Sequence, residues 1–304
     1  MFTSMSVARV DCLNYSISMF AASRLVYLLS ALAAASLFCA ASPAAMAADA
    51  SPWHDDMQSA ARLIAARVLN ESGGRVFRAG VEIKLKEGWK TYWRYPGDSG
   101  VPPALDFSAS QNVKAVTVRY PAPTRFPDGA GGNSIGYKGD VILPLRVVPQ
   151  DASKPVTLRL KLDYAACEKL CVPAEAKLEL MLSGAESANE TALASAEAHV
   201  PKPAAVGDSG TPAIRAVRRE AGSGKPRIVV DVAAAGVPAT LFAEGPTAQW
   251  ALPLPEPVAG APAGLQRFTF ELDGLPPGEK AEGATLRLTA VSGDKAVEVA
   301  FRLD

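Results

Sequence analysis

The sequence has little cysteine, little histidine and no excess of charge of either sign. Of its 304 residues only four are cysteine and two are histidine, and 31 basic side chains balance 31 acidic ones. A chain without net charge lacks the electrostatic footprint of a protein that binds nucleic acid or an anionic membrane. A zinc site takes about four ligands, and we cannot assemble such a set from these residues. We therefore predict neither a nucleic-acid partner nor a bound metal.

Long apolar runs are confined to the N-terminus. Arg24 is followed by LVYLLSALAAASLFCA, which has the length of a signal-peptide core but is short for a membrane anchor, and a small-x-small cleavage sequence ends at Ala47. Met19 begins a more compact leader than the first residue and is an alternative start. No later segment approaches the ~18 consecutive apolar residues of a membrane span. We predict a signal peptide over residues 1–47 and an exported mature chain without a transmembrane span.

Alternating apolar and polar residues recur along the rest of the chain. VTLRLKLDY (residues 156–164) and AKLELML (176–182) each place apolar side chains on one face and polar ones mostly on the other, which is the period of a half-buried strand. Glycine and proline, 24 of each, are spread along the chain, as in short strands joined by turns. SAARLIAARVLNE (59–71) fits a helix or a strand equally well. We predict an all-β fold.

The strand patterns fall into two blocks. Residues 48–184 hold the first, and residues 213–304 hold the second, which has about the size of one sandwich domain. Between them, residues 185–212 contain NETALASAEAHVP, typical of a short helix capped by Asn189, and then a Pro/Gly-rich linker. We therefore expect two β-domains, the second smaller than the first.

Cys167 and Cys171 are the only cysteines after the predicted leader. They lie on the connection between the two clearest strands, and we expect this connection to bend at Val172-Pro173. A regular helix would keep the pair too far apart for a disulfide, because helical neighbours lie ~5–6 Å apart at Cβ. A bent loop can bring the two sulfurs together.

Three chemical roles fit such a pair. A disulfide that closes so short a loop constrains the unfolded chain very little, which disfavours a structural staple. Cys-x-x-x-Cys-x-Pro also occurs in copper-handling Sco-like proteins, and thiolates suit Cu(I), but neither His54 nor His199 lies in a predicted strand of the first domain. Thiol–disulfide exchange requires only that a thiolate can reach a sulfur. Exchange is the interpretation we favour.

Three segments carry a resemblance to a known family: GWKTYWRYPGDSGVPP, YPAPTRFPDGAGGNSIGYKGDVILPLRV and YAACEKLCVPAEAKLEL. Together they resemble the N-terminal periplasmic domain of DsbD thiol:disulfide interchange proteins, most closely the ScsB-type branch associated with copper-sensitivity suppression. The resemblance covers about residues 59–183. It implies an immunoglobulin-like β-sandwich in which ARLIAARV is a strand. The second block resembles the companion domain of ScsB-like chains, which implies a second, smaller β-sandwich.

The resemblance also implies roles for the two cysteines. They would form a redox-active Cys167–Cys171 disulfide that needs no other cofactor. Cys171 would be the sulfur that exchanges with partners, and Cys167 would resolve the mixed disulfide. The spacing between the two cysteines is shorter than in the classical DsbD domain.

Five aromatic residues are candidates to surround the pair. The family has a cap loop whose aromatic side chain shields the cysteines, and TRFPDGAGGNSIGYKG matches this region, with Phe126 and Tyr137 as the candidate shields. Trp89 and Tyr92 are candidates to line the pair from the adjacent strand, and Tyr164 is a candidate from the strand that leads to Cys167.

The expected partners follow from the same resemblance. In the family, this domain receives electrons from a membrane-embedded domain through a thioredoxin-like domain and passes them to periplasmic oxidoreductases. The sequence ends at Asp304 without either of these domains. We therefore expect a periplasmic thiol:disulfide oxidoreductase that is recharged by a separate membrane electron donor and reduces a periplasmic thioredoxin-like oxidoreductase, in protection against copper or oxidants. A copper-binding chaperone using the same cysteines and a non-catalytic adaptor are the alternatives.

Overall fold

The computed structural model describes residues 48–71, 73–129, 131–221 and 224–304. The predicted signal peptide and the alternative start at Met19 lie outside the described residues. These described residues form one compact unit. None of the described helices is long and apolar enough to cross a membrane.

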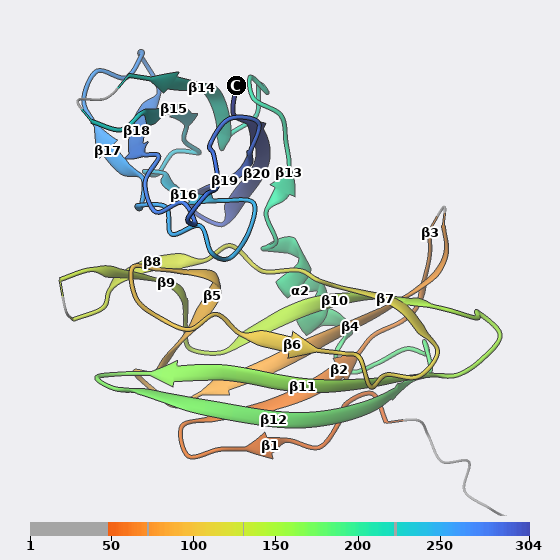
Figure 1. The fold of residues 1–304 in the computed structure, drawn as a ribbon. Coiled ribbons are helices and arrows are strands. Elements are labelled where there is room, and N and C mark those ends of the chain that lie inside the picture. Colours follow the sequence, from red (N-terminus) through yellow and green to blue (C-terminus); the bar gives the residue numbers. More distant parts are fainter. Residues whose placement is uncertain (1–47, 72, 130, 222–223) are drawn as a thin grey trace, which may run out of the picture. The chain divides into compact units, whose positions relative to one another are not determined.

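Two antiparallel sheets build the N-terminal part of this unit (Figure 1). The first has the order β1–β2–β4–β10–β7, with β3 paired to β4; the second has the order β12–β11–β5–β9–β8, with β6 paired to β11. The strands of the first sheet are β1 (His54–Asp55), β2 (Ser59–Ala65), β3 (Leu69–Glu71), β4 (Gly74–Leu85), β7 (Val113–Val118) and β10 (Val141–Pro149). Those of the second are β5 (Lys90–Gly97), β6 (Ala104–Asp106), β8 (Thr124–Pro127), β9 (Asn133–Lys138), β11 (Val156–Cys167) and β12 (Cys171–Leu182).

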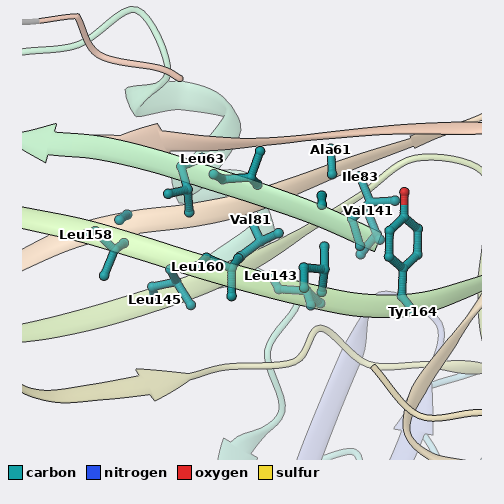
Figure 2. Packing of buried hydrophobic residues seen from close by; sticks show 14 of the residues in the cluster. Ala61, Leu63, Val81, Ile83, Val141, Leu143, Leu145, Leu158, Leu160 and Tyr164 are labelled. Carbon is teal, nitrogen blue, oxygen red and sulfur yellow. The ribbon is translucent and has the colours of Figure 1, made fainter. Parts of the chain in front are cut away.

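One hydrophobic core joins the two sheets, as expected for a β-sandwich. Figure 2 shows residues of β2, β4 and β10 packed with residues of β11. The alternation read from the sequence sets which side chains enter this core. Leu158, Leu160 and Leu162 of β11 are buried, while Lys161 between two of them is exposed. The strand over residues 59–65 settles the ambiguous segment and confirms the strand that the family resemblance implied.

The C-terminal part also consists of two sheets, with a hydrophobic core of its own. One has the order β13–β20–β19–β16, and the other β14–β15–β18–β17. The all-β prediction is therefore confirmed for both blocks. The strands are β13 (Lys202–Pro203), β14 (Ala213–Glu220), β15 (Arg227–Ala233), β16 (Thr240–Glu244), β17 (Glu256–Val258), β18 (Gln266–Glu271), β19 (Thr285–Ser292) and β20 (Lys295–Arg302).

The helix α2 (Glu190–Ala198) connects the two parts and packs on the first sheet. Leu193 is fully buried in a small cluster with Ile64 and Ala66. Arg78 of β4, also buried, pairs with both Glu190 and Glu197 of the helix. The short helix is thus held by tertiary contacts, since nine residues form a marginal helix alone.

The residue predicted to cap α2 lies at the expected position, but its side chain does not bond to the start of the helix. Asn189 occupies the N-cap position, yet its side chain makes no capping hydrogen bond. Its amide instead donates to the backbone oxygen of Asp49 at 3.0 Å. The linker after the helix is also not free, because β13 pairs with β20 in the second part.

Candidate functional site

Cys167 and Cys171 lie at the tip of the long hairpin formed by β11 and β12 (Figure 1). They are directly opposite each other in the register, with 4.1 Å between their Cα atoms, and form a disulfide. The predicted position between two adjacent strands is confirmed. The predicted bend is wrong: Val172 and Pro173 belong to β12, and the chain turns through residues 168–170. The sulfurs meet because cross-strand neighbours lie close together, so a proline bend is not needed.

The two cysteines differ in exposure. Cys167 is 5% exposed and packs in a small cluster with Tyr92 and Ala165, whereas Cys171 is exposed. Leu170, which precedes Cys171, is 79% exposed. One sulfur-bearing residue therefore faces solvent beside an apolar side chain, and the other lies inside the fold.

The hydroxyl of Tyr92, on β5, contacts the disulfide. This hydroxyl lies 3.0 Å from the Sγ atoms of both cysteines, and it donates because disulfide sulfurs carry no hydrogen. Burial raises the pKa of Tyr92 above its ordinary value of 10.0. The hydroxyl consequently keeps its proton at neutral pH and remains available as a donor.

Phe126 of β8 forms another wall of the same site. It is 3% exposed and lines a pocket of about 110 Å³ that contains both cysteines. The ammonium groups of Lys90 and Lys138 lie 5.0 and 5.5 Å from its ring centre, within cation–π range. The other lining residues are Lys90, Tyr92, Ser99, Gly100, Asp128, Ser134, Glu168 and Lys169.

Gly100 is a site residue that the sequence reasoning missed. Its φ is +137°, and a Cβ at this position would come within 2.3 Å of the Tyr92 ring. Glycine therefore allows the backbone to lie against the ring and to fix its direction. The only signal was the placement of this glycine in GDSGVPP, within a segment that carried the family resemblance.

The other three aromatic candidates do not line the pocket. Tyr164 is three residues from Cys167 on one strand, so it points to the opposite face, where its hydroxyl lies 2.7 Å from Ser59 Oγ. Tyr137 is buried in the core and donates to the carbonyl oxygen of Pro121 at 2.9 Å. Trp89 is half-buried just before β5 and is not among the lining residues.

The two histidines are both away from the cysteine pocket. His54 is exposed in β1, and His199 follows α2, where its Nδ1 lies 2.8 Å from the backbone oxygen of Ser195. In the part of the chain that the structure describes, no group of three or more histidine, cysteine, aspartate or glutamate side chains is arranged to hold a metal ion.

Removing the Tyr92 hydroxyl tests its contact with the sulfurs. In the reduced protein, we expect the hydroxyl to donate to a thiolate and stabilise it, since hydrogen bonds to charged groups contribute about 1.5–3 kcal/mol. Tyr92→Phe should therefore move the midpoint of the pH dependence of thiol alkylation upward by about one to two pH units. Tyr164→Phe, which removes a hydroxyl bonded to Ser59, is the matched control. An unchanged midpoint in Tyr92→Phe would contradict this role.

Comparisons with known proteins agree with this geometry. Residues 63–183 match the family model described as "Thiol:disulfide interchange protein DsbD, N-terminal". The chain is also similar in structure to the N-terminal periplasmic domain of ScsB from Proteus mirabilis, with a TM-score of 0.65 and 21% sequence identity over 84% of this chain and 98% of that one. At this identity the second likeness concerns the fold. Comparison with curated proteins gave no match.

Proposed function

From the premise that residues 63–183 form a domain of the DsbD N-terminal family, we propose that the protein exchanges electrons with a periplasmic partner through Cys167 and Cys171. One observation carries the proposal: a disulfide at a hairpin tip has one exposed and one buried cysteine, beside a tyrosine hydroxyl that contacts both sulfurs. Exchange by attack on a disulfide requires an accessible sulfur. The asymmetry supports Cys171 as the sulfur that contacts partners.

The proposed reaction starts from the reduced dithiol. The Cys171 thiolate attacks one sulfur of the partner's disulfide, which forms a mixed disulfide and releases the partner's other sulfur as a thiolate. The Cys167 thiolate then attacks Cys171 Sγ, closes the Cys167–Cys171 disulfide and releases the second partner sulfur. Two electrons pass to the partner, and two protons from solvent complete its thiols. The Tyr92 hydroxyl stabilises the thiolate at the pair.

The proposed partners are those that the match to the DsbD N-terminal family implies. The acceptor is a periplasmic thioredoxin-like oxidoreductase, whose active-site disulfide can meet the exposed Cys171 and the neighbouring Leu170. The donor is a separate membrane or thioredoxin-like reductase that returns two electrons to the disulfide. Export by a cleaved N-terminal signal peptide belongs to this proposal, because an oxidising compartment allows such a disulfide to form.

A trapping experiment tests the function. In Cys167→Ser the mixed disulfide forms at Cys171 but is not resolved, so a covalent adduct with the partner should accumulate in periplasmic extract. Non-reducing electrophoresis followed by mass spectrometry would identify the adduct and the linked peptide.

The double variant Cys167→Ser, Cys171→Ser is the control and should capture nothing. The proposal is wrong if the single variant forms no adduct with any thioredoxin-like protein and the parent does not exchange with one. An inert disulfide together with non-covalent partners would instead favour the adaptor function.

A further inference from the structure

The Phe126 wall of the cysteine pocket belongs to a weakly supported strand. β8 is at the edge of its sheet and is paired there with β9. Side chains alternate along a strand, so Phe126 and Arg125 point to opposite faces. Phe126 lines the pocket, and Arg125 extends towards the second sandwich.

Arg125 is bound by that second sandwich. Its Nη1 donates to the carbonyl oxygen of Pro255 at 3.3 Å, and its Nη2 pairs with Glu256, the first residue of β17. Two consecutive residues of β8 therefore make different contacts. One covers the cysteine pocket, and the other contacts a domain about 130 residues further along the chain.

The strand β5, which carries Tyr92 on another side of the pocket, is also bound to the second sandwich, through a less exposed ion pair. Two residues after Tyr92, the Arg94 guanidinium binds Glu244 through two bonds of 2.9 and 2.7 Å and also pairs with Glu298. Glu244 is 11% exposed at its side chain, whereas Glu256 is 58% exposed. The Arg125–Glu256 pair is open to solvent on its Glu256 side, and such pairs contribute little, so the Arg125 contact can be released while β5 stays in place.

We propose that Arg125 is a positioning residue: held by Glu256 and the Pro255 carbonyl of the second sandwich, it keeps Phe126 against the pocket that contains Cys167. With the wall in place, Cys167 stays covered and incoming sulfurs meet Cys171. When the contact breaks, β8 moves and Cys167 becomes reachable. The second sandwich thereby contributes to the choice of the reacting sulfur. The inference rests on the proposed exchange function, because control of the reacting sulfur matters only if the cysteines exchange with a partner. The test of the inference can be done without a partner.

The rate at which Cys167 is alkylated reports whether Phe126 covers the pocket. In a Cys171→Ala background, the rate of reaction of Cys167 with iodoacetamide is followed by peptide mapping as a function of pH. The plateau rate at high pH reports accessibility, and the midpoint reports thiolate formation. Adding Glu256→Ala should raise the plateau by about two- to fivefold, the change expected for loss of an exposed ion pair. The midpoint should stay where it is.

The second sandwich provides a matched control. Glu282 is also 58% exposed and pairs with an arginine, Arg219, but within its own domain, so Glu282→Ala should leave the plateau unchanged. Phe126→Ala removes the wall and should raise the plateau further, and adding Glu256→Ala to it should have no additional effect. The inference is wrong if Glu256→Ala behaves like Glu282→Ala, or if its effect persists in full without Phe126. Because no partner is present, these outcomes are independent of whether exchange with a thioredoxin-like protein occurs.

Discussion

Replacing Cys171 with alanine should abolish exchange with thioredoxin-like proteins and leave the fold intact. Cys171 is the exposed residue of the pair, and Cys167, at 5% exposure, remains covered when Cys171 is gone. A single buried thiol can neither accept nor release two electrons as a disulfide. The expected rate is that of the reaction without protein, measured by reduction of a thioredoxin-like substrate under anaerobic conditions.

The stability of this variant separates a chemical from a structural effect. A disulfide that closes a loop of about five residues stabilises a protein by about 2 kcal/mol in the chain-entropy model, less than longer loops do. Cys171→Ala should therefore still unfold cooperatively, with near-parent circular dichroism. Met181→Ala is the control on the same strand, since Met181 is 51% exposed and outside the pocket. Full exchange activity in Cys171→Ala would overturn the assignment of the reacting sulfur.

Replacing Arg94 with methionine should destabilise the protein by about 3–5 kcal/mol, the cost of removing one partner from a buried ion pair. Burial lowers the pKa of Arg94, but hydrogen bonds and charges from Glu244 and Glu298 outweigh this and hold the pKa above its ordinary value. The guanidinium is therefore charged and bound to both carboxylates. Without it, the Glu244 carboxylate loses its partner in a site where its side chain is only 11% exposed.

Urea unfolding followed by tryptophan fluorescence measures this loss. Trp93, one of four tryptophans, packs against Phe242 with 5.7 Å between ring centres, so part of the emission reports the contact beside Arg94. Arg159→Met is the matched control: its pair with Glu179 is exposed, and the expected loss is below about 1 kcal/mol. Adding Glu244→Leu to Arg94→Met should recover part of the stability, because the unpaired charge is then removed. Equal losses in Arg94→Met and Arg159→Met would contradict the expectation.

The sequence allowed prediction of those parts of the fold that depend on near neighbours. The alternation in β11 and β12 predicted two strands with the cysteines between them, because side-chain direction changes at every residue of a strand. The bend at Val172-Pro173 was predicted wrongly, since strand pairing continues up to the cysteines themselves. The short helix was predicted from its composition, whereas the bond of Asn189 to Asp49 depends on a residue 140 positions away.

The candidate site likewise combines features that the sequence predicted with features that depend on the tertiary structure. Among the aromatic candidates, the structure brings Tyr92 and Phe126 to the cysteines and places Tyr137 and Tyr164 in the core. Composition does not separate these four, because each is an aromatic residue in a strand-like segment. Their separation depends on which face of each strand turns to the hairpin tip, and that is settled by the register between strands.

By itself, the sequence determined that this protein is all-β and that it has two blocks of strands, and it singled out Cys167 and Cys171 as the candidate site. These features follow from local periodicity and from residue scarcity. Only the tertiary structure decided that Cys167 is covered and Cys171 exposed, that one hydroxyl reaches both sulfurs, and that Arg125 is bound by Glu256. The physical reason is that burial and such contacts arise between residues far apart in the chain, which meet only when the sheets have paired and packed.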